Sequence, residues 1–343
     1  GVQTCALPIC KAIFLLFTFC KTILTTGLTE RIKGMTDIVA LNKIASQKAK
    51  SYYCGVAWPT VLICLATFAC YWSLPYLVMF SGFTLWLAIP VMVALTYAAY
   101  TVLHESVHGS INGNNKSMKG LNDGLGYLAG TILAIPLTAH RIEHLTHHAM
   151  TNHAEKDPDG YSANIVSSPL GMLQSAWKAI AIQYQLYSRL HWPKASRAVK
   201  ATFVIEIVFI IALRVLPFFV LWQSGDPELI AGWWRVLALF VVAGLLGTIA
   251  LVYLFAYIVH RPHDVTGRYA DTSTIVIPRP FSTVATVLWG YQNYHSIHHL
   301  FPRVPFYRYR RLFHDIADTM DAMKAPVYRL TWRGLKSIKA MDA

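Results

Sequence analysis

Four long apolar segments limit what this chain can fold into more than any other feature of its sequence. They run from Val56 to Phe80, from Phe83 to Leu103, from Ala201 to Trp222 and from Trp233 to Val259. Each reaches the roughly 20 residues that a helix needs to cross the hydrocarbon core of a bilayer. Because that core offers no water to backbone groups, a spanning segment must satisfy its own hydrogen bonds, as a helix does. The sequence therefore predicts an all-α integral membrane protein with four transmembrane helices.

The composition agrees with this prediction. Of the 343 residues, 55% are hydrophobic and only 14% are charged, whereas about 25% of the residues in a soluble domain are charged. The net charge of +13 could suggest nucleic acid, but the Lys and Arg residues form no cluster interleaved with aromatic residues. We therefore expect no nucleic-acid partner.

The positions of the basic residues predict the topology. Of the 30 Lys and Arg residues, all but Arg214 and Arg235 lie before the first span, between the second and third spans, or after the fourth. By the positive-inside rule, both termini and the long middle segment are cytoplasmic, in an inner or plasma membrane. The spans then form two helical hairpins beneath a cytoplasmic helical cap. A weaker apolar stretch, Leu121 to Ala139, is short and interrupted by Gly and Pro, which favours a re-entrant or interfacial piece.

The first 34 residues stand apart from the rest of the chain. Their opening, Gly1 to Ile9, resembles an in-frame translation of a sequencing adapter, and the first methionine is Met35. We expect residues 1–34 to be a non-native or untranslated leader. Residues 35–343 are then expected to form a single membrane domain.

The histidines gather in clusters at or after the cytoplasmic ends of the spans. Within each cluster they stand three or four residues apart, so on a helix their imidazoles share one face. The candidate ligands are His104, His108, His144, His147, His148, His260, His295, His298 and His299. Neutral imidazole is a good ligand for iron, copper, nickel and zinc, and eight or nine imidazoles exceed what one ion can take. The pattern therefore predicts a two-metal site on the cytoplasmic face.

Other polar residues near these clusters are candidates for a supporting role. Acidic side chains could accept the outer N–H groups of the imidazoles and so fix their tautomers; these are Glu105, Glu143, Asp157, Asp159 and Asp264. Three more histidines, His140, His153 and His263, could support the ligands or face the substrate. His191 and His314 are isolated, and we assign them no role. No catalytic residue beyond the metal ligands is predicted.

Two other classes of protein compete with this interpretation. His104-Glu105-Ser-Val-His108 also matches the H-E-x-x-H signature of zinc metalloproteases. A site of that kind keeps only three protein ligands, which leaves the other two clusters unexplained. A metal transporter would place ionisable residues along its spans. Here the spans contain almost none: Glu206 and Arg214 lie in the third span, and Arg235 lies near the start of the fourth.

The order H-x-x-x-H, H-x-x-H-H, H-x-x-H-H with paired spans resembles the membrane fatty acid desaturase superfamily, over roughly residues 50 to 315. In detail, the segments from Tyr257 to Pro262 and from Gln292 to Tyr307 are most similar to desaturase-type β-carotene hydroxylases. The middle cluster, with Asn152, Asp157, Pro158 and Asp159, is similar as well. The first cluster departs from those hydroxylases, because it has His-Glu where they commonly have His-Asp.

The resemblance implies two iron ions held by the nine candidate histidines, with O2 as co-substrate. It also implies an external electron donor such as a ferredoxin or a cytochrome. The sequence agrees on the donor, since it contains no Gly-rich dinucleotide loop, haem-attachment motif or Cys cluster.

The expected reaction is the hydroxylation or desaturation of a lipid hydrocarbon that enters from the bilayer. The motif detail favours ring hydroxylation of a β-carotene-type substrate, and fatty-acyl desaturation is the alternative. Aromatic residues that could guide the hydrocarbon are Trp58, Trp72, Trp86, Tyr97 and Tyr100.

Overall fold

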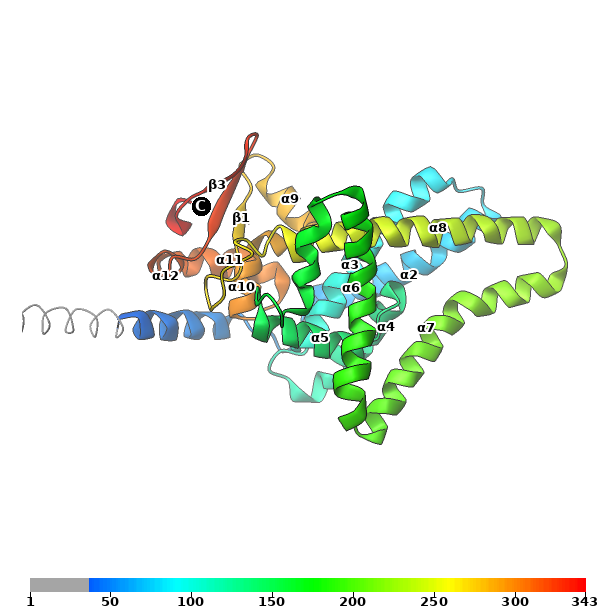
Figure 1. The fold of residues 1–343 in the computed structure, drawn as a ribbon, viewed down its shortest axis with the longest axis horizontal. Coiled ribbons are helices and arrows are strands. Elements are labelled where there is room, and N and C mark those ends of the chain that lie inside the picture. Colours follow the sequence, from blue (N-terminus) through cyan, green and yellow to red (C-terminus); the bar gives the residue numbers. More distant parts are fainter. Residues whose placement is uncertain (1–36) are drawn as a thin grey trace, which may run out of the picture. The chain divides into compact units, whose positions relative to one another are not determined.

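The computed structural model of the protein describes residues 37–343 (Figure 1). The predicted leader, residues 1–34, and the predicted start at Met35 lie outside the described residues. The described part of the chain falls into two units, residues 37–48 and Ala49–Ala343. Everything below concerns the second unit; the prediction of a single domain from residue 35 onward stays a prediction.

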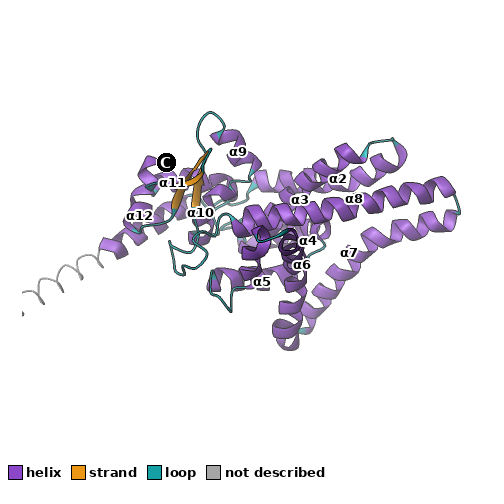
Figure 2. Ribbon diagram, turned by 45° about the horizontal axis from the view of Figure 1, so that its top comes forward, coloured by secondary structure: helices purple, strands orange, loops and turns teal. Residues whose placement is uncertain are grey.

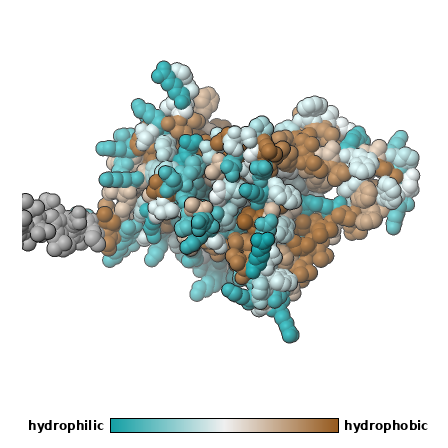
Figure 3. All heavy atoms as spheres, in the orientation of Figure 1, coloured by the Kyte–Doolittle hydropathy of each residue, from teal (hydrophilic) through white to brown (hydrophobic). Residues whose placement is uncertain are grey.

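Four helices are long and apolar enough to cross a membrane. They are α2 (Trp58–Phe80), α3 (Leu85–His108), α7 (Arg197–Ser224) and α8 (Pro227–Leu251), which continues as a π-helical turn over Val252–Tyr257. Their outer faces expose large apolar side chains, as lipid contact requires. Figure 3 shows these side chains gathered over the span helices, away from the more polar end of the molecule. The prediction of a four-span helical membrane protein is confirmed, whereas the pairing of the spans into two hairpins stays a prediction.

The inner faces of α2, α3 and α8 pack together into an apolar core. Tyr71 and Leu74 from α2 meet Met92 from α3 and Leu239 from α8. The contact between α3 and α8 is close at Gly247, where an added Cβ would lie 3.0 Å from the Thr96 methyl group. This core fixes the end of α3, from which His104 and His108 project.

Helices α4 (Lys119–Leu133) and α5 (Leu137–Met150) replace the weak apolar stretch that the sequence predicted to be interrupted. Neither is among the helices of the described chain that are long enough to span the bilayer. The chain breaks between them at Ala134, whose φ of 56° is left-handed, and Pro136 then precedes the first residue of α5. The break lets α5, which carries the middle histidine cluster, leave the direction of α4 (Figure 1).

The remaining elements form the predicted helical cap. Its helices are α6 (Pro169–Leu186), α9 (Ser282–Leu288), α10 (His295–Leu300), α11 (Tyr309–Asp315) and α12 (Ala317–Ala322). Short 3-10 or π-helical turns cover Lys116–Met118, Pro158–Val166, Tyr187–His191, Trp192–Lys194, Gln292–Tyr294, Phe306–Arg308 and Ala340–Asp342.

A small three-stranded sheet, which the sequence did not predict, lies beside the last helices (Figure 2). Strand β1 (Thr274–Val276) pairs in parallel with β2 (Val327–Thr331), which pairs in antiparallel fashion with β3 (Gly334–Ser337). The Thr274 and Ser296 hydroxyls lie 2.6 Å apart, and the Asn293 amide donates to the Ile275 carbonyl at 3.0 Å. The sheet therefore anchors the segment that carries the third histidine cluster.

The α4–α5 break should be sensitive to one methyl group. At Gly130 an added Cβ would lie 2.5 Å from the Ile135 carbonyl oxygen, a backbone atom, whereas at Gly124 nothing lies within 4 Å. We expect Gly130→Ala to lower the free energy of unfolding by about 1–3 kcal/mol, because the backbone must shift. Thermal unfolding of the detergent-solubilised protein measures this, with Gly124→Ala as the control. Equal stability of the two variants would contradict the close approach.

Candidate metal centre

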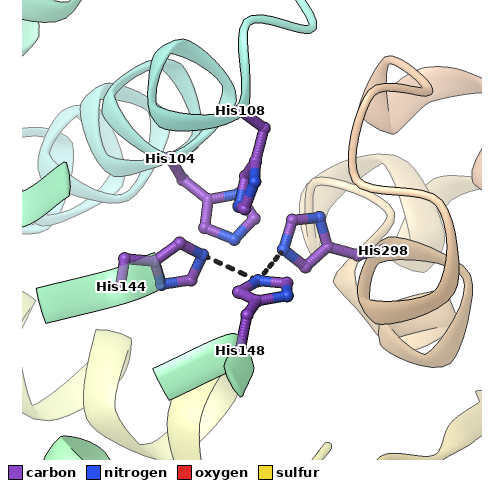
Figure 4. A group of neighbouring side chains, drawn as sticks. All are labelled: His104, His108, His144, His148 and His298. Carbon is purple, nitrogen blue, oxygen red and sulfur yellow. Dashed lines mark hydrogen bonds between the residues drawn. The ribbon is translucent and has the colours of Figure 1, made fainter. Parts of the chain in front are cut away.

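The structure brings histidines from three helices into one tight group. His104 and His108 come from α3, His144 and His148 from α5, and His298 from α10. One nitrogen from each imidazole lies within 4.8 Å of the corresponding nitrogens of the others. The His148 Nε2 atom is 3.0 Å from His144 Nε2 and 2.9 Å from His298 Nε2. Figure 4 shows the five rings turned toward a common point.

A second group lies beside the first. His147 from α5, His260 from the segment after α8 and His299 from α10 also bring their ring nitrogens within 4.8 Å of one another. The His260 Nε2 atom is 2.9 Å from His147 Nε2 and 3.3 Å from His299 Nε2. The rings of His148 and His299 stack with their centroids 4.1 Å apart, so the two groups are in contact.

The ninth predicted ligand, His295, lies beside the second group. Its ring centroid is 4.8 Å from those of His260 and His299. Its Nε2 atom is buried and has no hydrogen-bond partner. The structure therefore places all nine predicted histidines together, eight of them in two compact groups. Their role as ligands remains a proposal.

Outer hydrogen bonds leave the Nε2 lone pairs of several rings directed inward. His147 Nδ1 lies 2.8 Å from Asp157 Oδ1, and His295 Nδ1 lies 2.8 Å from Gln292 Oε1. Because these oxygens only accept, both nitrogens carry the proton, and each Nε2 of a neutral ring is then an acceptor. Acceptor nitrogens cannot satisfy one another, but they are what a metal ion binds.

A longer chain of hydrogen bonds supports His298. Its Nδ1 atom lies 2.9 Å from the Tyr309 hydroxyl, which donates to Glu105 Oε1 at 3.3 Å. The Phe306 amide donates to Glu105 Oε2, also at 3.3 Å. Glu105 thus holds the third histidine cluster through Tyr309. This arrangement does not fit the general base of a zinc metalloprotease.

Burial keeps most of these imidazoles neutral. It lowers the pKa of His144, His260 and His298 well below the usual range, and the neighbouring imidazoles lower it further. His147 differs: burial would lower its pKa, but the carboxylates of Asp159 and Asp157 outweigh burial and raise it to about 9. The pKa of Asp157 is lowered although burial opposes this, because His147 donates a hydrogen bond to it.

The other predicted supporting residues divide into buried and peripheral ones. Asp159 lies 3.7 Å from His147, and Glu143 lies 3.3 Å from His140 Nδ1. His140, Glu143 and His144 form a third small group that could hold a metal ion.

The peripheral residues have no such contact with the two histidine groups. His153 and His263 both line a small cavity that also reaches His147 and His260, and Asp264 is exposed. The structure gives Asp264 no place beside a candidate ligand, so this assignment is not supported.

Sequence reasoning assigned no role to four polar residues that hold this site. Gln292 and Tyr309 support His295 and His298, and Gln183 Oε1 lies 3.1 Å from His140 Nδ1. The Asn152 amide donates to the carbonyls of Pro262, Val265 and Asp271 at 2.8–3.0 Å and so ties the loop after α5 to the loop after α8. Only Gln292 and Asn152 carried a signal, because both lie in the motifs of the resemblance.

An apolar cavity of about 200 Å³ begins beside the first group and extends between α3, α6 and α8. Tyr100 and Phe255 line it, and their ring centroids lie 6.0 and 5.5 Å from that of His104. Of the aromatic residues expected to guide a hydrocarbon, Tyr100 therefore has a fitting position. Trp58 and Trp86 are exposed on the outside.

The residues present fit a metal centre. Buried ring nitrogens of His104, His108, His144, His260 and His295 have no hydrogen-bond partner, although unpaired buried polar atoms are rare in folded proteins. An all-imidazole set of this size suits transition metals rather than magnesium or calcium. Fold and site together define a helical membrane protein with histidine groups able to hold metal beside an apolar cavity.

Comparison with known families identifies the chain further. The sequence model of the fatty acid desaturase family matches residues 81–331, so the chain belongs to that family. An endoplasmic-reticulum omega-3 fatty acid desaturase of Vigna radiata is 22% identical over 247 residues, which are 64% of this chain and 60% of that protein. The sn-1 acyl-lipid omega-3 desaturase (ferredoxin) of Synechocystis is 24% identical over 243 residues, 63% of each chain.

A third relative matches over a shorter stretch. The omega-3 fatty acid desaturase fat-1 of Caenorhabditis elegans is 34% identical over 89 residues, 25% of this chain and 21% of that protein. The chain spans about three fifths of the length of the first two relatives. These relatives support the acyl alternative better than the β-carotene hydroxylation that the motif detail favoured.

The proposed ligands can be separated from other histidines by metal content. We expect the purified protein to hold about two iron ions per chain, and His148→Ala or His298→Ala to reduce this number and abolish turnover. His314 is exposed, and its ring lies beside Tyr294 and Phe313 rather than in a histidine group, so His314→Ala should keep both metal and turnover. Elemental analysis measures the content. One zinc and no iron, or equal losses in all three variants, would contradict the assignment.

Asp157 and Asp264, two of the three aspartates predicted to support the ligands, should behave differently. Asp157→Asn keeps the shape of the side chain but removes the charge that holds His147 Nδ1–H, so metal affinity should fall about 10-fold or more. Asp264→Asn changes an exposed residue and should leave the affinity within about twofold. Competition with a chromophoric chelator measures both. An unchanged affinity in Asp157→Asn would show that this hydrogen bond does not support a ligand.

Proposed function

We propose that this chain is a membrane-bound, O2-dependent di-iron desaturase of fatty-acyl chains. The observation that carries the proposal is the pair of histidine groups beside an apolar cavity between the span helices. Membership of the fatty acid desaturase family and the printed activities of the relatives support the acyl substrate. The nine histidines would hold two iron ions, which supply the oxidising chemistry with O2 when bound.

The overall reaction balances without a cofactor that belongs to the chain. A –CH2–CH2– unit loses two hydrogens and becomes –CH=CH–, while O2 takes up those hydrogens, two electrons and two protons to give two waters. The electrons must come from a donor protein, and a ferredoxin is favoured because one relative is named as ferredoxin-dependent. We propose that the basic face, the termini and the metal site lie in the cytoplasm, where an acidic donor would complement the positive charge.

The protein itself would position the substrate and exclude water from the site. Tyr100 and Phe255 line the cavity and also lie next to His104, so they would hold a hydrocarbon close to the imidazole group. Burial of the group excludes water that would quench a reactive species or leak protons. Outer hydrogen bonds hold the imidazole rings in place; they come from Asp157, Gln292 and the Glu105–Tyr309 pair. A substrate carbon in the cavity would therefore lie beside rings of fixed orientation.

Expression in a host that makes β-carotene, with a compatible ferredoxin, tests the substrate. We expect new unsaturated fatty acids by gas chromatography of the acyl methyl esters, with β-carotene unchanged. His298→Ala serves as the inactive control. Hydroxylated carotenoids with unchanged fatty acids would overturn the acyl proposal. They would favour ring hydroxylation, the reaction of the β-carotene hydroxylases that the segment from Gln292 to Tyr307 resembles.

A further inference from the structure

Inside the apolar part of the span α7 lie two ionisable residues, Glu206 and Arg214, to which the proposed function assigns no role, although Arg214 lines the far part of the cavity. Glu206 is buried, and Arg214 is partly buried, on a helix whose other side chains mostly face outward. An ionisable side chain within the hydrocarbon region is costly, so it is kept only where a partner compensates it. Both residues find that partner at the break between α4 and α5.

Helix α5 begins without a cap of its own. Its N-cap position is Pro136, which makes no side-chain hydrogen bond, and its first turn contains no acidic residue. The first amides of a helix have no acceptor within the helix. In α5 these amides lie where α4 and α5 meet against the span helix α7.

Glu206 supplies the missing cap from another helix. The Thr138 amide lies 3.4 Å from Glu206 Oε1 and 3.3 Å from Oε2, and the Thr138 hydroxyl donates to the same carboxylate. The Leu137 amide is a further donor to it. An anionic oxygen at a helix N-terminus also interacts favourably with the helix dipole.

Arg214 binds the other side of the break, at the C-terminal end of α4. It lies two helical turns after Glu206, on the same face of α7. Its guanidinium donates to the carbonyl of Ile132, in the last turn of α4, at 3.0 Å, and lies 5.5 Å from the centre of the Trp72 ring. A cation at a helix C-terminus is the sign that the dipole favours.

We propose that Glu206 and Arg214 are positioning residues that clamp the α4–α5 break and thereby set where α5 presents its imidazoles. His144, His147 and His148 follow Thr138 on the same rigid helix, so a shift at its start moves all three. This proposal rests on the proposed metal site, but not on the identity of the substrate.

Co2+ binding to the metal-free, purified full chain tests the clamp without turnover. Glu206→Leu removes the acceptor oxygens, and we expect about tenfold weaker Co2+ binding, with altered d–d absorption bands and faster hydrogen exchange at the first amides of α5. Glu206→Gln keeps an acceptor oxygen and should restore the affinity to within about threefold. Glu228→Leu, at an exposed position in the first turn of α8, is the matched control.

Arg214→Met, compared with Arg235→Met at an exposed position of α8, should weaken Co2+ binding in the same direction as Glu206→Leu. If Glu206→Leu does not fold, Glu206→Thr, whose side chain is too short to reach Thr138, takes its place. Wild-type affinity, spectrum and exchange in the Leu or Thr variant would overturn the proposal. A Glu206→Gln variant that binds Co2+ as weakly as Glu206→Leu would also overturn the proposal. A wild-type protein that binds Co2+ but oxidises no acyl chain would refute the proposed function and leave the clamp standing.

Discussion

The candidate site depends on the crowding of imidazole nitrogens within hydrogen-bonding distance of one another. His148 Nε2 lies within 3.0 Å of two other Nε2 atoms, and His260 Nε2 has two similar neighbours. Where two facing nitrogens both lack a proton, their lone pairs oppose each other, and a metal cation between them would remove that repulsion. The helices that bring them together must therefore be held by other contacts, and much of the fold around the site serves that purpose.

Those contacts come from several separate segments of the chain. The packing of α2 and α8 fixes α3, the small sheet anchors the segment before α10, and Asn152 ties the loop after α5 to the loop after α8. The outer hydrogen bonds of His147, His295 and His298 then fix the rings themselves. Because the rings are oriented by different segments, the geometry of the site depends on the packing of the whole part of the protein outside the span helices.

The sequence predicted the spans and the histidine groups because both follow from simple periodicity. A helix places residues three and four apart on one face, so the spacing of His144, His147 and His148 was sufficient to group them. It could not show that His147 and His148 turn to different groups, because that depends on how α10 and the segment after α8 approach α5. Tyr309 lies 11 residues after His298, and Gln183 lies 43 residues after His140. Both separations exceed the three- and four-residue spacing of one helix face, so only tertiary packing brings these residues to the two histidines.

Two other features were beyond the sequence pattern. The three-stranded sheet has short strands that pair across about 50 residues, and such pairing leaves little local signal. The relatives support an acyl substrate better than the carotenoid that the motif detail favoured. The motif around His295 reflects how the histidines are arranged, which does not depend on what lies in the cavity. The sequence showed Glu206 and Arg214 as ionisable residues within a span. It could not show that both contact the break between α4 and α5.

The scatter of the nine histidines along the chain, from His104 to His299, has a consequence for the life of the protein in a cell. No single segment contains all of the proposed ligands, so an affinity for metal would arise only after distant parts of the chain have met. The free energy of metal binding is then part of the free energy of folding. A cell short of iron would be expected to lose the polypeptide itself to its membrane proteases, and the abundance of the protein would follow the supply of the metal.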